Sequence, residues 1–409
     1  MNIVYDRCAG LDVHKRTVVG CVREAGGGTA RASETRTFAT TIQGLLALSD
    51  WLESHGVTHV AMESTGVYWR PVFAVLETSF EVLLVNARHV KSVPGRKTDV
   101  RDCEWLAQLL ECGLLSGSFV PPKPIRDLRD LTRYRKALIR DRGHHVNRVA
   151  KTLELANIKL GCVVTDIMGK SGRAILDALI AGVADVDSLA DLAQGSVRKK
   201  RGALREAVEG RMTPHYAFLL RQQLSVIDEL ERHISQLDAR IEDCIRPFDR
   251  AYEILKTAPG VAERAAQVII AEIGIDMGQF PTPERLASWA RVCPGTRESA
   301  GKRLASGTGK GNPWLRATLQ EVAWAAARTR RSYYHALYYR LKARLGAQKA
   351  IVAVQHAVLV AIWHMLKNTV PHQDLGSDYF DRRNADRIRS HHVRRLQSLG
   401  YTVTVERAA

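Results

Sequence analysis

The sequence of 409 residues predicts an α/β domain in its first part, followed by a long helical region. Three observations lead to this fold class. Short apolar stretches separated by turns occupy residues 8–39 and are typical of strands. Alternating helical and strand patterns follow, up to about residue 112. Beyond the proline-rich segment Pro121-Pro122-Lys123-Pro124 every pattern is helical, which predicts a domain boundary near residue 122.

The first domain is expected to span residues 1–122. Its expected elements are, in order, strands at 8–13, 17–23 and 32–39, a helix at 42–54, a strand at 59–63, a helix at 68–78, a strand at 81–85 and a helix at about 102–112. The turn Gly26-Gly27-Gly28 favours antiparallel pairing of the first strands. Three such strands followed by alternating helices and strands are the order of a ribonuclease H-like fold, a mixed sheet flanked by helices.

Residues 123–247 are expected to form a coiled-coil arm. A helix from Leu128 to about Leu155 is dense in arginine, and a second long helix carries apolar residues at steps of three and four. That near-heptad stripe consists of Leu220, Leu224, Ile227, Leu230, Ile234, Leu237, Ile241 and Ile245. Shorter helices between the two are expected to cap the arm. A third, mostly helical domain is predicted over 248–370, and a basic tail over 371–409, which we expect to become ordered on nucleic acid.

The charge predicts a polyanionic partner. Sixty Lys and Arg against 43 Asp and Glu give a net charge of +17, which favours nucleic acid over the alternative of a merely basic protein. The seven cysteines show no CxxC spacing, which disfavours a zinc site or a disulfide framework and favours a reducing cytoplasm. No membrane span is expected, because the apolar stretch 351–365 is interrupted by Gln355, His356 and His364.

Four acidic residues are candidate ligands for Mg²⁺: Asp12, Glu63, Asp99 and Asp102. Two-metal phosphoryl transfer needs several carboxylates at one place. The first and fourth strands are neighbours in the expected sheet, and Asp99 and Asp102 share one helix face. Any one of these acids alone is more often solvated or a helix-dipole residue, whereas the four together favour a metal site. His14 could ligate metal, but we expect it to face away or to contact phosphate.

Ser299, in PGTRESAGKR, is a candidate nucleophile. The flanking residues Arg297, Lys302 and Arg303 could hold a phosphate and favour an alkoxide. A serine before Ala-Gly is, on its own, more often a turn or cap residue.

Two further loops suggest contacts with phosphate. The TAPGV turn and the helix after it resemble half of a helix-hairpin-helix, with backbone N–H groups near Gly260 available to phosphate, although an ordinary helix start fits nearly as well. The run SGTGKGN lacks the spacing of a P-loop, which excludes an NTPase. We expect Lys310 and Arg316 to contact phosphates there.

Several motifs in this order resemble the IS110 family of insertion-sequence transposases, from Val4 to about Leu366: GLDVHK, ESTGVYW, VNARHV, KTDVRDCEWLAQLL, SGRAILDALIAG, TAPGV and PGTRESAGKR. The resemblance implies a RuvC-like domain whose Asp-Glu-Asp-Asp metal site falls on the four acids above. It also implies a C-terminal transposase domain whose serine, here Ser299, attacks DNA to form a phosphoserine link, in a centre shared between protomers. The chain departs from many relatives in having Ala300 rather than glycine and a longer basic tail.

The resemblance further implies a mobile-element recombinase guided by a structured non-coding bridge RNA that pairs with donor and target DNA. It implies a homo-oligomer, a dimer or a tetramer on DNA, in the bacterial cytoplasm at the nucleoid. The candidate nucleic-acid contacts are Lys97, Arg129, Arg133, Arg140, Arg148, Gly260, Lys302, Lys310 and Arg316. Two alternatives stay open: a RuvC-like nuclease or junction resolvase that hydrolyses DNA with water while Ser299 is structural, and a non-catalytic nucleic-acid-binding relic.

Overall fold

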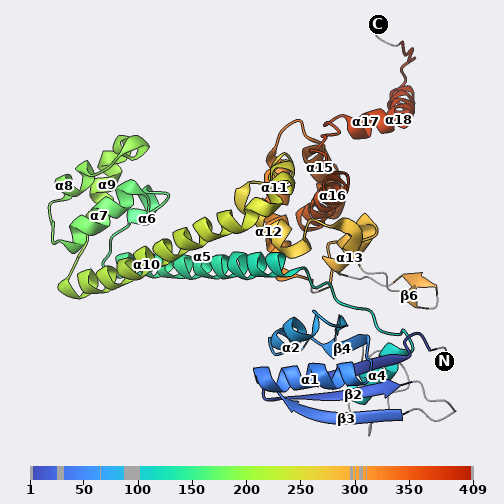
Figure 1. The fold of residues 1–409 in the computed structure, drawn as a ribbon. Coiled ribbons are helices and arrows are strands. Elements are labelled where there is room, and N and C mark those ends of the chain that lie inside the picture. Colours follow the sequence, from blue (N-terminus) through green and yellow to red (C-terminus); the bar gives the residue numbers. More distant parts are fainter. Residues whose placement is uncertain are drawn as a thin grey trace. The chain divides into compact units, whose positions relative to one another are not determined.

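The computed structural model describes residues 3–24, 32–64, 66–86, 102–294, 298–299, 301–303, 307–309 and 311–406. The chain divides into two compact units, Met1–Val120 and Pro121–Ala409. The division lies near the expected boundary at residue 122, and the arm and the C-terminal helices belong to the same unit. Each unit is described by itself, with the labels of Figure 1.

The first unit contains a mixed five-stranded sheet with the order β3-β2-β1-β4-β5. Its strands are β1 (Arg7–Val13), β2 (Thr17–Glu24), β3 (Ala32–Ala39), β4 (His59–Glu63) and β5 (Glu81–Val85). β1 pairs antiparallel with β2, and β2 with β3, whereas β4 runs parallel to both β1 and β5. All five strands lie where the apolar alternation predicts them, and β1 and β4 are neighbours as expected.

Within the described part of this unit, three helices cover the sheet, two on one face and one on the other (Figure 1). They are α1 (Ile42–Ser54), α2 (Trp69–Leu76) and α4 (Asp102–Glu111). Leu11 and Met62 point to the face covered by α1 and α2 and belong to the main core. Since side chains alternate along a strand, Cys8 and Ala61 point to the opposite face, where they pack against Leu110 of α4.

In the second unit, α5 (Lys123–Leu155) and α10 (Pro214–Ile245) pair along the arm (Figure 1). The near-heptad stripe of α10 faces this interface: six of its eight residues are buried, and Leu230 and Leu237 are half-buried. One end of the arm carries a cap with its own apolar core. The cap consists of α6 (Leu160–Val163), α7 (Lys170–Ile180), α8 (Val186–Asp191), the 3-10 turn η1 (Gly195–Lys200) and α9 (Arg201–Val208).

The other end of the arm joins the C-terminal helices. These comprise η2 (Arg246–Phe248), α11 (Asp249–Lys256), α12 (Glu263–Ile273), η3 (Met277–Gln279), α13 (Pro283–Trp289), α14 (Pro313–Arg328), α15 (Tyr333–Leu345) and α16 (Ala347–Asn368). A hairpin of β6 (Glu298–Ser299) and β7 (Lys302–Arg303) lies between α13 and α14 in the chain. By length and composition α16 is apolar enough to cross a membrane, but it packs against α13, α14 and α15, as a core helix does.

The basic tail contains two helices, α17 (Tyr379–Arg383) and α18 (Ala385–Ser398). The expectation that this segment becomes ordered on nucleic acid stays a prediction. Neither helix has a buried residue. An aromatic contact joins the tail to α15, because Phe380 stacks on Tyr333 with ring centroids 5.3 Å apart.

Candidate active site

Gly10 allows α4 to lie directly on β1. A Cβ atom at position 10 would be 2.2 Å from the carbonyl oxygen of Cys103 and 2.4 Å from the amide nitrogen of Ala107. Both are backbone atoms of the helix, so no side-chain movement would relieve the overlap. Glycine is therefore required here for close contact between backbones.

The direction of α4 places its first residue near Asp12. Leu110, near the end of the helix, packs against Cys8, whereas the first turns of the helix lie over Gly10. The helix thus runs antiparallel to β1, and Asp102 lies toward the end of the strand that carries Asp12. Burial raises the pKa of the Cys103 thiol to about 12, and the negative charge of Asp12 is among the smaller causes. Since side chains alternate along a strand, Asp12 points to the same face as Cys8 and Gly10, which is the face that α4 covers.

Glu63 lies beside Asp12 at the neighbouring strand end. In the parallel register of β1 and β4, Leu11 is opposite Met62, so the two acids are the next residues on adjacent strands. Residues in register point to the same face, and adjacent strands are about 4.8 Å apart. Asp12 is 29% exposed and Glu63 is half-buried. The sheet and α4 together bring Asp12, Glu63 and Asp102 to one edge of the fold.

His14 contacts this group of acids. Its Nε2 atom is 3.1 Å from Oδ2 of Asp12, so the expectation that His14 faces away is wrong. The strand ends at Val13, and the turn that follows bends the chain back toward β2, which frees His14 from the alternation of the sheet. An Nε2–H at this distance would donate to the Asp12 carboxylate and fix its orientation.

The acids have the chemistry of a magnesium site. Asp12, Glu63 and Asp102 supply the hard oxygen ligands that Mg²⁺ prefers, and like charges held together are stabilised by a cation. Asp99, the fourth expected ligand, and Lys97 lie outside the described residues. Within the ranges that the structure describes, no group of three His, Cys, Asp or Glu side chains has metal-binding geometry. The described acids therefore have the ligand chemistry that Mg²⁺ requires. Which of them bind the ion stays a prediction.

The backbone of Ser299 lies at the turn end of the β6–β7 hairpin. Ser299 pairs with Lys302 across the two strands, and Gly301 in the turn adopts a positive φ of 72°. Only the backbone of Ser299 and Lys302 is described, and Lys310 is outside the described residues. The register makes Lys302 the cross-strand neighbour of the serine, as a phosphate-binding role would require.

Arg129 and Arg133, two predicted nucleic-acid contacts, bind protein groups instead. Glu272, at the end of α12, is fully buried. Arg133 donates through Nε and Nη2 to its two carboxylate oxygens, at 2.8 Å each. Arg129 donates to the main-chain oxygens of Ala271 and Glu272, at 2.9 and 2.8 Å. These guanidinium groups join α5 to α12, and for both residues the structure favours a structural role.

The same carboxylate reaches the segment that follows the serine hairpin. Asn312 donates its side-chain N–H to Glu272, while its Oδ1 caps α14 by accepting from the backbone amides of Trp314 and Leu315. Arg316, one turn into α14, donates to the carbonyl oxygen of Gly309 at 2.9 Å. Arg316 therefore holds the loop before α14, which is a different role from the phosphate contact that we predicted.

The other candidate contacts differ in exposure. The side chain of Arg140 is 69% exposed, and Arg148 is also exposed, so both cations of α5 are accessible. Gly260 has a φ of 83°, and a Cβ there would be 2.5 Å from the carbonyl oxygen of Val322 and 2.9 Å from the amide of Ala326. Packing of this turn against α14 explains the glycine without nucleic acid.

Sequence reasoning missed Gly10, Glu272 and Asn312. A glycine inside an apolar strand signals close backbone approach, and Gly10 fits that pattern. Glu272 is the single acid in the apolar run VIIAEIG, which points to a buried charge with a partner. Asn312 before Pro313 is a helix N-cap signature. Each residue type is therefore unusual at its position in the sequence. The residues that it contacts lie far away in the chain, so the sequence alone does not identify them.

Comparison with known protein families gives two matches. Residues 9–158 match a DEDD transposase family of the IS110 type, and residues 252–340 match the transposase IS116/IS110/IS902 family. The first match contains Asp12, Glu63 and Asp102 together with Arg129 and Arg133, and the second contains Glu272, Asn312 and the Ser299 hairpin.

Two relatives are similar over most of the chain. A putative transposase, y4rJ, of Sinorhizobium fredii is 27% identical over 285 residues, which are 65% of this chain and just under two thirds, 65%, of the relative. An uncharacterized 44.8 kDa protein of insertion element IS116 from Streptomyces clavuligerus is 26% identical over 324 residues, 70% of this chain and 78% of the relative. Because the two family matches together cover more than half of the chain, the chain belongs to the IS110 family of transposases.

Proposed function

We propose that this chain is the transposase of a mobile element and that it cuts, exchanges and rejoins DNA strands. The observation that carries the proposal is the placement of Asp12 and Glu63 at adjacent strand ends of a mixed sheet, with Asp102 at the start of the helix that lies over β1. Carboxylates at such an edge are the usual means of phosphoryl transfer on nucleic acid. The net charge of +17 supports a polyanionic substrate. A ribonuclease H-like, RuvC-like fold of the first unit is part of the proposal and agrees with the order of the sheet.

The acids are proposed to act with a divalent cation. A bound Mg²⁺ would neutralise charge at the reacting phosphate and polarise its oxygens. Asp12, Glu63 and Asp102 would hold it, with Asp99 as the fourth ligand. His14 would orient the Asp12 carboxylate through the contact between Nε2 and Oδ2.

Ser299 is proposed as the nucleophile. Its Oγ would attack the DNA phosphorus and form a serine–phosphate ester while one P–O bond of the strand breaks. The hydroxyl proton passes to solvent, and the departing strand end leaves as a hydroxyl. Attack of a strand-end hydroxyl on this ester would release the serine and rejoin DNA. The hairpin turn supports this role, because it places Ser299 across from the cationic residue Lys302.

The proposal also includes a guide RNA, a homo-oligomeric assembly and a cellular location. A structured non-coding RNA would choose the DNA, and the exposed cations Arg140 and Arg148 of α5 would contact its backbone. The chain would act as a homo-oligomer, a dimer or a tetramer on DNA, in the bacterial cytoplasm. The second candidate function is hydrolysis of DNA with water at the acids alone, which the described acid cluster would also support.

A recombination assay tests the proposal. A plasmid carries the gene with its flanking DNA, and junctions formed by excision or circularisation are amplified from cells. Wild-type protein should form junctions, and Asp12→Asn and Glu63→Gln should reduce them at least about a hundredfold, because each removes a proposed ligand. Asp50→Asn, on the exposed side of α1, is the matched control and should retain them. Junctions at wild-type frequency in Asp12→Asn would contradict the proposal.

A further inference from the structure

We propose that the exposed side of α15 binds unpaired nucleotides, with a base stacked on Tyr339 and phosphates held by Arg340, Lys342 and Arg344. These four residues are called the α15 surface below. The inference deepens the proposed function, because it names the part of a nucleic-acid partner that the second unit would hold.

The sequence around α15 contains an unusual charge run. Residues 322–373 include no Asp or Glu, and their eight Lys and Arg are Arg328, Arg330, Arg331, Arg340, Lys342, Arg344, Lys349 and Lys367. All eight are exposed. Among the residues that the structure describes, none of the eight has an ion-pair partner. A cluster of uncompensated cations is the electrostatic signature of a phosphate-binding surface.

Two exposed cations of the arm, Arg201 and Arg232, differ in this respect. Arg201 lies 2.7 Å from Asp191 and 2.8 Å from Asp187, and Arg232 lies 2.5 Å from Glu229. These side chains are 46% and 52% exposed, so exposure alone does not separate them from the α15 surface. Their carboxylate partners neutralise them. Arg201 and Arg232 are thus exposed cations with carboxylate partners, unlike the eight cations of residues 322–373.

An aromatic ring lies among the cations of α15. Tyr339 is 54% exposed. His335, one turn earlier, holds it in place: the two ring centroids are 4.6 Å apart, and Nδ1 of His335 is 2.8 Å from the carbonyl oxygen of Ala327. Lys342 lies over the Tyr339 ring at 5.7 Å. A pre-oriented, exposed ring between cations is the arrangement that binds single strands by base stacking.

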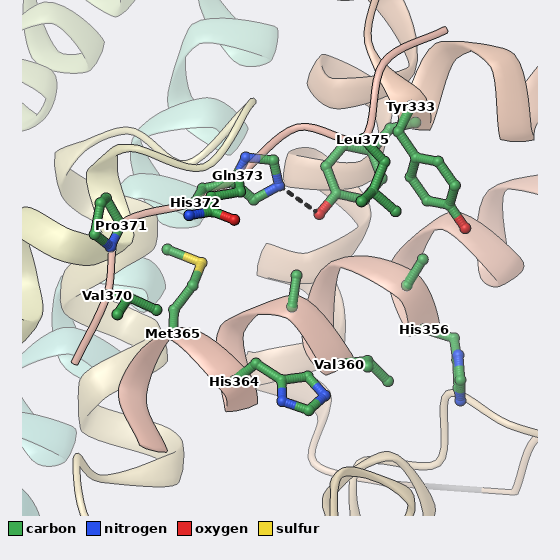
Figure 2. A pocket seen from close by; sticks show the side chains of 13 residues that line it. Tyr333, His356, Val360, His364, Met365, Val370, Pro371, His372, Gln373 and Leu375 are labelled. Atoms are coloured by element: carbon green, nitrogen blue, oxygen red, sulfur yellow. Dashed lines mark hydrogen bonds between the residues drawn. The ribbon is translucent and has the colours of Figure 1, made fainter. Parts of the chain in front are cut away.

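The opposite side of α15 is fixed to the rest of the unit. A pocket of about 540 Å³ lies beside α15 and is lined by residues that include Tyr333, His356 and His372 (Figure 2). The hydroxyl of Tyr334 is 3.0 Å from Nε2 of His372. Phe380 of the tail stacks on Tyr333, the first residue of α15, with ring centroids 5.3 Å apart, and Arg340, at the margin of the α15 surface, lies over the same Phe380 ring at 5.3 Å. These contacts hold the helix while its outer side stays open to solvent.

The chemistry favours unpaired nucleotides over a duplex. In a duplex the bases are stacked on one another and their faces are not available to Tyr339. A single strand exposes them, and each base stacked on an aromatic side chain contributes about 1–3 kcal/mol. The source of the strand can be RNA or DNA, and the experiment below separates the two.

Fluorescence anisotropy with the full chain tests the proposal. The probes are a labelled 15-nucleotide RNA, a DNA of the same pyrimidine sequence and a duplex DNA of equal length. Tyr339→Leu should weaken binding of a single strand about tenfold, and Tyr339→Phe should restore it, because Phe keeps the stacking face. Lys342→Gln with Arg344→Gln should weaken it at least about tenfold and lower the salt dependence by about 0.7 per charge removed.

The matched control is Arg201→Gln with Arg232→Gln, which removes the same net charge from neutralised side chains. It should change affinity less than about twofold. Weaker binding of the α15 variants to the RNA probe alone, or to the single-stranded DNA probe alone, supports the proposal and identifies which of the two the surface binds. Equal loss from both double variants, wild-type binding by Tyr339→Leu, or a larger loss for duplex than for single strands would overturn it. Asp12→Asn should bind normally, which separates this proposal from the catalytic one.

Discussion

Arg133 of the arm and Glu272 of α12 form an ion pair with two hydrogen bonds, each 2.8 Å long, and the carboxylate is fully buried. Asn312 donates to the same carboxylate, and Arg129 donates to the adjacent carbonyl oxygens. One buried charge therefore connects the root of the arm with the helix that follows the serine hairpin. A disturbance of this pair should affect both stability and the position of the hairpin.

Glu272→Gln should lower the free energy of unfolding by about 3 kcal/mol, because it leaves two guanidinium groups without their carboxylate. Urea unfolding of the variant measures this loss. A double-mutant cycle with Arg133→Met should give a coupling of at least about 1 kcal/mol.

The exposed pair Arg142–Glu231 serves as the control for that cycle, since it has similar geometry without burial. Its coupling should stay below about 1 kcal/mol. Equal couplings for the two pairs would show that burial of Glu272 does not strengthen its interactions.

Gly10→Ala should displace α4 from β1, because the added Cβ overlaps backbone atoms of the helix. We expect a loss of about 1–3 kcal/mol in unfolding free energy and a loss of recombination in cells. Gly143→Ala, inside α5 with no atom within 4 Å of the added Cβ, should be neutral or stabilising. A Gly10→Ala protein with wild-type stability and junction formation would contradict the proposed role of this contact.

Stability should fall at acidic pH because of two half-buried histidines. Burial lowers the pKa of both His356 and His372 below the ordinary value near 6.5. Below pH 6.5 the unfolded chain binds more protons than the folded chain, so the free energy of unfolding decreases as pH falls. The urea midpoint should drop between pH 7.5 and 5.5, and less so in a His356→Gln, His372→Gln variant. His391→Gln, on α18, should leave the drop unchanged; an equal drop in all three proteins would contradict this origin.

Much of the first unit is predictable from the sequence. Period-two alternation gives the five strands, and the order of elements gives the pairing of β1 with β4, which places Asp12 beside Glu63. The long helices of the arm follow from the stripe that contains Leu220 and Ile241. These features depend on the spacing of apolar residues within one segment, which a single sequence shows directly.

The roles of individual arginines are not predictable in the same way. Arg133 and Arg140 lie on the same helix and look alike in sequence, yet one binds Glu272 and the other is 69% exposed. Their difference depends on acids more than a hundred residues away. Composition shows that a segment is basic, and only the structure shows which cations already have carboxylate partners.

Trapping a covalent protein–DNA intermediate is the most direct test of the proposed chemistry. Purified protein is incubated with Mg²⁺, the candidate guide RNA and labelled DNA from the ends of the element, and is then denatured in detergent. Wild-type protein should retain labelled DNA that protease releases, Ser299→Ala should retain none, and Ser288→Ala, an exposed serine of α13, should behave as wild type. Cleaved DNA with free 5′-phosphate ends and no adduct, or an adduct in Ser299→Ala, would contradict the account.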